Sequence, residues 1–214
     1  MGIYPPEPLR LMQLILPKTL TWIALTLLVW VCTSNDIFAG DALSPSKGAL
    51  LVATTNLDQS SFRQTVILLT HYSERGATGI AINRSAKISL KEAFPNHKEF
   101  NDVTENLFLG GPVRTDAVFV LMQTQRPHAG MRKIANNIYF TVGIDAISHG
   151  LDNMDTDEYA RAYMGYTGWA PGQLSAEIAR GDWLVVKSDP SIIFQNDHEK
   201  MWQKLYQSWS GHWI

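Results

Sequence analysis

Short apolar runs rich in β-branched residues, separated by turn residues, limit the fold of this chain more than any other feature. They cover residues 49–53, 65–72, 78–83, 107–109, 117–123, 138–142, 160–166 and 183–186. Runs of this length and composition are typical of β-strands, and the turn residues 74–76 predict a hairpin over residues 65–83. Strands and helical patterns do not alternate strictly, so the sequence favours a single α+β domain with a largely antiparallel sheet over a doubly wound fold.

Four helical segments are expected between and after these strands: residues 89–94, 144–149, 171–180, and a last helix from residue 196. Ser89 is placed to cap the first, and Gly181 to end the third in the left-handed conformation. Asn196 and Glu199 have the spacing of a capping box, which predicts that the last helix begins at Asn196. Residues 152–157 are expected to form a charged loop.

The N-terminal segment has the layout of a signal peptide. A 13-residue, mostly apolar run at residues 20–32 follows Arg10 and Lys18 and precedes a polar stretch. As a helix this run would extend about 20 Å, short of the roughly 30 Å hydrocarbon core. We therefore expect cleavage after Ala39, a linker at 40–48, a domain at 49–214 and export to the periplasm. Retention at the inner membrane by an uncleaved segment is the alternative, and either Met1 or Met12 could be the start.

The charge and cysteine content of the sequence limit the classes of partner and cofactor that can be expected. Residues 1–39 hold two of the 18 basic and two of the 20 acidic side chains, so the remainder keeps the net charge of -2. Without a basic stripe, a nucleic-acid partner lacks its main electrostatic attraction and is not expected. The only cysteine is Cys32, and the histidines show no paired metal-ligand spacing. No metal or cofactor is expected. The chain is expected to contact the membrane only through the signal segment, before cleavage.

Three segments in order resemble the YqgE/AlgH family of bacterial proteins. They are residues 50–84, 107–113 and 165–185, followed by a DP-x-I-x-F stretch at 189–194 and a tryptophan-bearing last helix. The resemblance implies an α+β fold with a bent, partly barrel-like sheet flanked by helices. It implies no reaction, because the family has no settled biochemical function, although some members are labelled transcriptional regulators. Family members normally begin near the first strand without a signal, and an exported domain would not meet the chromosome.

A first group of candidate ligand-binding residues lies at strand ends and in a glycine-rich turn. Asn83 and Arg84 follow an expected strand and could present an amide and a guanidinium to a small anion. Asn83 could instead satisfy turn backbone groups, with Arg84 in solvent. Gly110 and Gly111 could aim backbone amides at a ligand, or form only a tight turn.

A second group lies where the helix at 171–180 begins. Trp169, Gly172 and Gln173 surround this helix start, where free amides could receive an anion. Glu177 lies one turn after Gln173 and could act as a base or orient a ligand. The alternative is structural: Trp169 packs on the sheet and Gln173 caps the turn.

Three functions remain open from the sequence. The first is a non-catalytic binding or regulatory domain of the cell envelope, with a small anion or an envelope protein as partner. The second is a hydrolase-type enzyme using Glu177, His71 and Asn83, although the chain has no GxSxG, HExxH or phosphate-loop motif. The third is the transcriptional regulator of the family label.

Overall fold

The computed structural model describes residues 43–101, 105–143 and 158–210. The strands are β1 (Leu50–Ala53), β2 (Val66–Ser73), β3 (Gly76–Ala81), β4 (Ser85–Ser89), β5 (Asn106–Leu109), β6 (Val113–Gln123), β7 (Arg132–Ala135), β8 (Ile138–Val142), β9 (Tyr159–Trp169) and β10 (Trp183–Val186). The helices are α2 (Leu90–Ala93), α4 (Gln173–Ala179), α5 (Pro190–Ile193) and α6 (Met201–Ser210), with 3-10 turns η1 (Thr55–Leu57), η2 (Lys98–Phe100) and η3 (His198–Lys200).

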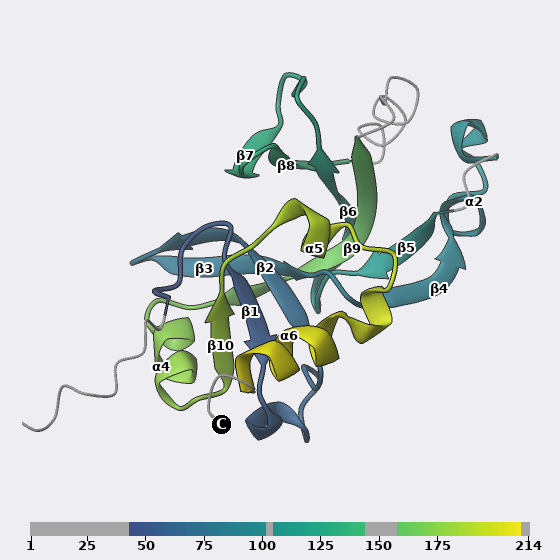
Figure 1. The fold of residues 1–214 in the computed structure, drawn as a ribbon. Coiled ribbons are helices and arrows are strands. Elements are labelled where there is room, and N and C mark those ends of the chain that lie inside the picture. Colours follow the sequence, from purple (N-terminus) through teal and green to yellow (C-terminus); the bar gives the residue numbers. More distant parts are fainter. Residues whose placement is uncertain (1–42, 102–104, 144–157, 211–214) are drawn as a thin grey trace, which may run out of the picture. The chain divides into compact units, whose positions relative to one another are not determined.

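One mostly antiparallel sheet contains all ten of these strands, as the sequence predicts for an α+β fold (Figure 1). Its order is β10-β1-β2-β3-β9-β6-β8-β7, and β4 pairs with β5, which runs parallel to β9. The sheet bends so strongly that β7 comes back to Gly48, two residues before β1. A Cβ atom at Gly48 would lie only 2.9 Å from the carbonyl oxygen of Ile134.

Strand β1 and the first five residues of β2 are buried on both faces, which explains their apolar sequences. Leu50 and Leu68 pack into one cluster with the apolar side chains of α6, whereas Leu51 and Leu69 pack into a second cluster with Leu174 of α4. Helix α6 thus lies against β1, and α4 lies beside β3 and β10 (Figure 1). A third cluster places α2 and η2 over the strands β5, β6 and β9.

A close backbone crossing joins the loop after β5 to the middle of β9. A Cβ atom at Gly110 would lie 2.3 Å from the Gly165 carbonyl oxygen, and one at Gly165 would lie 2.4 Å from the Gly111 carbonyl oxygen. The Gly110 amide donates to the Met164 carbonyl at 2.8 Å. Only glycines permit this approach, because any side chain would overlap the facing backbone.

Side-chain hydrogen bonds connect β1 and the residues just after it to the end of α4 and to α6. Thr54 Oγ1 donates to the Gly181 carbonyl oxygen at 2.6 Å, and Asn56 Nδ2 donates to the same oxygen at 3.2 Å. The indole of Trp202 in α6 donates to the Ala53 carbonyl oxygen at 2.8 Å. These contacts fix the end of α4 and the start of α6 against β1.

Several local expectations are confirmed. Residues 65–83 contain the β2–β3 hairpin, and Ser89 and Glu92 form a capping box at α2. Gly181 is left-handed with φ +79° after α4, as a helix stop requires.

Other local expectations are wrong. Asn196 does not begin the last helix: the chain turns through η3 first, and Asp197 binds Lys204 and Lys200 instead of capping. The helix predicted from residue 171 begins at Gln173, because the backbone at Gly172 is left-handed. The sequence patterns also missed β4, β7 and α5. The expected segments at residues 1–39, 144–149 and 152–157 lie outside the described residues.

Among the described residues, no helix is both long and apolar enough to cross a membrane.

The glycine crossing predicts a large difference between two alanine substitutions with nearly the same φ. Gly165 has φ +71° and Gly172 has φ +74°, but a Cβ atom at Gly172 would meet nothing within 4 Å. We expect Gly172→Ala to cost about 1 kcal/mol of unfolding free energy for the left-handed backbone alone. Gly165→Ala should cost at least about 2 kcal/mol more, because the methyl group overlaps a backbone oxygen. Urea denaturation measures both, and equal costs would contradict the crossing.

Candidate functional site

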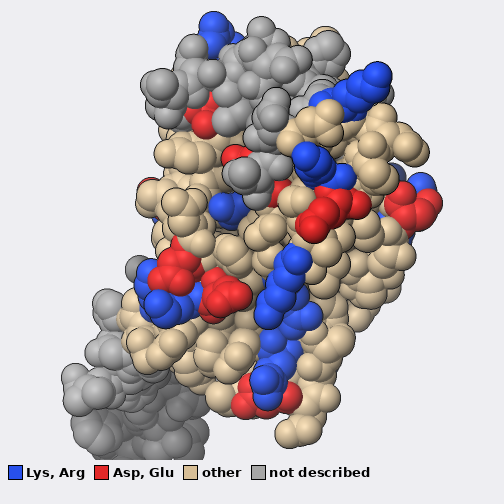
Figure 2. All heavy atoms as spheres, turned by 90° about the vertical axis from the view of Figure 1, so that its right-hand side faces the viewer, with Lys and Arg blue, Asp and Glu red and all other residues tan. Residues whose placement is uncertain are grey.

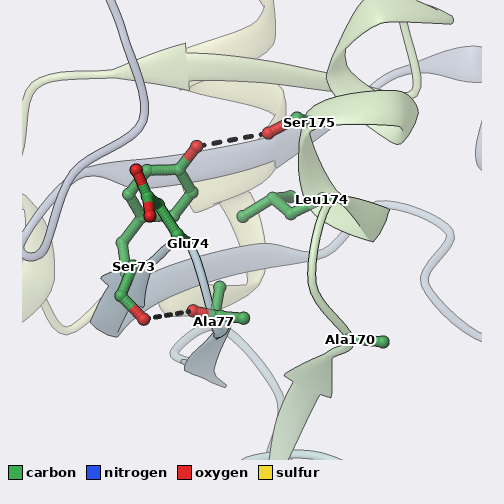
Figure 3. Close-up of a pocket in the computed structure, with 9 residues that line it drawn as sticks. Ser73, Glu74, Ala77, Ala170, Leu174 and Ser175 are labelled. Carbon is green, nitrogen blue, oxygen red and sulfur yellow. Dashed lines mark hydrogen bonds between the residues drawn. The ribbon is translucent and has the colours of Figure 1, made fainter.

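Six of the eight candidate ligand-binding residues from the sequence line three surface hollows, whereas Asn83 and Gly110 line none of these three. Gly172 lines a hollow of about 490 Å³ between the β2–β3 hairpin and α4 (Figure 3). The hydroxyl groups of Tyr72 and Ser175 lie 3.2 Å apart in it, and Ser73 Oγ donates to the Gly76 carbonyl oxygen. In that view Leu174 comes from α4 and Glu74 from the hairpin end. This hollow contains none of the other candidates, so Gly172 lines a different hollow from the adjacent Gln173.

Three of the candidates lie together in a second hollow, of about 250 Å³, which we call the tryptophan hollow. It is lined by Leu57, Phe62, Pro112, Val113, Thr167, Gly168, Trp169, Gln173, Glu177, Arg180, Asp182 and Trp183. The rings pack edge to face, with 5.8 Å between the centroids of Phe62 and Trp183 and 6.2 Å between those of Trp169 and Trp183. The hollow therefore has rigid aromatic walls with a carboxylate on one side.

Glu177 of α4 holds these walls together. Its Oε2 atom accepts hydrogen bonds from the indole N–H groups of Trp169 at 2.8 Å and Trp183 at 2.9 Å. Its Oε1 atom accepts from Gln173 Nε2 at 2.9 Å, while Gln173 Oε1 accepts from the Ala170 amide at 3.0 Å. Trp169 and Trp183 are buried, so their N–H groups would lack partners without this carboxylate.

A third hollow, of about 270 Å³, contains Arg84 and Gly111 and is called the Arg84 hollow. It is lined by Ser61, Phe62, Thr65, Ala81, Arg84, Leu109, Gly111, Pro112 and Thr115. Its walls are largely apolar, and Leu109 is 47% exposed although it is a large aliphatic side chain. The Leu109 amide donates to the Arg84 carbonyl oxygen at 2.8 Å, which fixes the backbone of Arg84 beside the glycine crossing.

The guanidinium of Arg84 is half-buried without a carboxylate to balance it. Its Nη2 atom donates to the Arg63 carbonyl oxygen at 3.0 Å, and no Asp or Glu within the described ranges forms an ion pair with it. Burial lowers the pKa of the Arg84 guanidinium, because removal from water disfavours the charged form. An anion in the hollow would offset that cost.

The tryptophan and Arg84 hollows are neighbours, because Phe62 and Pro112 line both. Their shared rim is a bulge at the start of β6: Val113 pairs with Tyr166 and Val118 with Met164, so β6 advances five residues where β9 advances two. The extra residues turn outward, and Arg114 in the bulge has φ +49° and binds Asp116 at 3.0 Å. Bulges of this kind are common next to binding sites.

Asn83 and His71 serve other contacts. Asn83 Oδ1 accepts from the Val66 amide at 2.9 Å, and its Nδ2 donates to the Gln64 carbonyl at 2.9 Å. His71 is exposed and its Nε2 lies 3.1 Å from Ser73 Oγ. Neither residue lines a hollow with Glu177, so the three groups of the hydrolase hypothesis are not brought into one site here.

Gly110 and Gly111 contribute to the candidate site by allowing a close backbone approach, more than by offering hydrogen-bond donors. The Gly110 amide is already used by Met164, and its carbonyl accepts from the Ala81 amide at 2.8 Å. Gly111 lines the Arg84 hollow next to Pro112. Gly111 therefore lies at a hollow, whereas Gly110 has no free amide to offer a ligand.

Sequence reasoning missed Phe62, Pro112, Arg180, Asp182 and Thr167 as lining residues, because they come together only through tertiary packing. Arg180 and Asp182 pair at 2.7 Å on the rim of the tryptophan hollow. Thr167 is 4% exposed, and its hydroxyl has no hydrogen-bond partner among the described residues. No group of three His, Cys, Asp or Glu suited to a metal ion occurs in that same part of the chain.

The surface charge is mixed on the face shown in Figure 2, where basic and acidic side chains lie interspersed. Over the whole chain the net charge is -2. This face does not present the broad positive surface that a phosphate backbone attracts.

Comparisons with known proteins agree on one relationship. A family model described as AlgH-like matches residues 50–213. Two curated relatives are named UPF0301 protein. The one from Pelodictyon phaeoclathratiforme is 32% identical, over 78% of this chain and 88% of its own length. The one from Chlorobium chlorochromatii is 31% identical, over 77% of this chain and 86% of its own length. The solution structure of the AlgH protein from Pseudomonas aeruginosa aligns with a TM-score of 0.64 at 25% identity, covering 79% of this chain and 92% of that one.

We predict that Asn83 supports the fold. In Asn83→Ala the buried Val66 amide loses its acceptor, so the unfolding free energy should fall by about 2 kcal/mol. Asn106→Ala, at an exposed position of β5, should change it by no more than about 0.5 kcal/mol. Urea denaturation of both variants measures the difference, and an unchanged stability in Asn83→Ala would contradict this assignment.

Proposed function

This chain belongs to the AlgH-like family, and from that premise we propose that it is a non-catalytic binding domain whose ligand carries a carboxylate beside an apolar group. The observation that carries the proposal is Arg84, a half-buried guanidinium without a carboxylate partner among the described residues, in a hollow with apolar walls. A carboxylate can bind such a guanidinium through charge-assisted hydrogen bonds. Phe62 and Leu109 would contact the apolar part of the ligand.

Two further observations support binding rather than catalysis. Glu177 accepts three hydrogen bonds that orient side chains around it, and Asn83 is engaged with two backbone groups. A general base needs to reach a proton of the substrate, and a hydrolase would also need donors for the developing oxyanion. The Gly110 amide, which could serve as such a donor, is engaged with Met164.

We also propose that the domain acts in the cell envelope after export. The support is the apolar run at residues 20–32, preceded by basic residues and followed by a polar stretch and Ala39. A ligand would then be met in the periplasm, where small anions and envelope proteins are the available partners.

Export is tested by cell fractionation and mass spectrometry of the natural product. The expected result is a periplasmic protein whose first residue is Gly40. An intact N-terminus in the cytosolic fraction would contradict the proposed location, and an intact N-terminus in the membrane fraction would favour the uncleaved alternative.

Binding is tested by isothermal titration calorimetry of the full chain with N-acetyl-leucine and N-acetyl-phenylalanine, each compared with its uncharged amide. We expect saturable binding of the carboxylates and weaker binding of the amides. Arg84→Gln should weaken carboxylate binding about tenfold or more, as expected for loss of a hydrogen bond to a charged group. Arg75→Gln, at the exposed β2–β3 turn, is the matched control and should leave it unchanged. Carboxylate binding that is equal in Arg84→Gln and the wild type, or absent from both, would contradict the proposal.

A further inference from the structure

The tryptophan hollow carries a charge opposite to that of the neighbouring Arg84 hollow. Glu177 lines it, and no Lys or Arg in the described part of the chain forms an ion pair with that carboxylate. Arg180 and Asp182 on the same rim neutralise each other at 2.7 Å. One negative charge therefore remains in this hollow, and one positive charge in the hollow beside it.

Glu177 also has room for another donor. A carboxylate can accept about four hydrogen bonds, and Glu177 accepts three, all from neutral N–H groups. Neutral donors orient the carboxylate but leave its charge in place. Thr167 also lines this hollow, but its hydroxyl is buried and has no partner among the described residues. An ammonium group carries three donors, so it could bind the free acceptor position of the carboxylate.

The region shared by the two hollows is apolar and fixed. Phe62 packs against the buried Trp183, and Pro112 follows the glycine crossing, which positions it against β9. Apolar walls exclude water, so charges on either side act on a ligand more strongly than they would at an open surface. A ligand that spans the two hollows would place its middle against Phe62 and Pro112.

We propose that the ligand is a short peptide with both termini free, whose carboxylate binds Arg84 and whose terminal ammonium group binds Glu177. This inference rests on the proposed function, because it takes the carboxylate site at Arg84 as given and adds the group that fills the tryptophan hollow. Opposite charges in adjoining hollows match the opposite charges at the two ends of such a peptide. Selectivity then comes from the ammonium group, because a ligand without it leaves Glu177 unbalanced.

The test compares three ligands by isothermal titration calorimetry of the full chain at pH 7. They are the dipeptide alanyl-leucine, its N-acetyl derivative, and lactoyl-leucine, in which a hydroxyl replaces the amine. We expect alanyl-leucine to bind at least about tenfold more tightly than either analogue, because only it offers a charged donor to Glu177. This preference should decline above about pH 8, as the α-amino group loses its proton.

Two variants test which side chain binds the terminal ammonium group of the peptide. Glu177→Gln should abolish the preference for alanyl-leucine over N-acetyl-alanyl-leucine. Glu74→Gln, at the exposed end of the β2–β3 hairpin, should keep the preference. If Glu177→Gln fails to fold, the lactoyl comparison on the wild type and its pH dependence still decide the outcome.

The possible failures are distinguishable. Equal binding of all three ligands with loss in Arg84→Gln would overturn the peptide inference and leave the carboxylate site standing. A preference for alanyl-leucine that persists in Glu177→Gln would overturn the assignment of the amine to Glu177. Absence of any Arg84-dependent binding would overturn both proposals.

Discussion

The close approach of the glycine turn to β9 is the constraint on which the candidate site depends. Gly110, Gly111 and Gly165 let two backbones approach to distances that no side chain would permit. This contact sets where Pro112 lies and where the bulge of β6 begins, and the Leu109 amide, just before the turn, fixes the Arg84 carbonyl. The two hollows with opposite charge are neighbours because Phe62 and Pro112 line both, and Pro112 directly follows this crossing. The glycines therefore act through geometry, without presenting amides to a ligand.

The polar candidates divide according to where their hydrogen bonds go. The side-chain amide of Asn83 uses its oxygen and its nitrogen in hydrogen bonds to the backbone of Val66 and Gln64, so Asn83 contributes to the fold. Glu177 accepts three hydrogen bonds from neutral groups and Arg84 donates one to a carbonyl, so neither has an ion-pair partner among the described residues. In a partly dehydrated setting an unbalanced charge is the feature that favours a ligand, because the folded protein alone does not compensate it.

Much of the fold was predictable from local patterns. Strand β1 and the first part of β2 are apolar and buried on both faces, and the hairpin and the Ser89 capping box follow from short-range chemistry. The strand β4 was not predictable, because it is polar, bulged and has Lys87 at φ +59°. The capping-box spacing at Asn196 was misleading because a 3-10 turn intervenes. For the candidate site, the sequence named Arg84 and Gly111 separately and Trp169 together with Glu177, whereas their common neighbour Phe62 is defined only by tertiary packing.

The pairing of β1 with β10 has a consequence for how this domain is made. Leu51 pairs with Val185, and the Trp202 indole reaches the Ala53 carbonyl, so the first strand depends on residues more than a hundred positions later. Such high contact order slows folding, because long loops must close before the contacts that stabilise them form. While the nascent chain emerges from the ribosome, β1 lacks one neighbour until residues 183–186 have been synthesised. The native pairing of β1 with β10 therefore forms only after all the strands between them have been made.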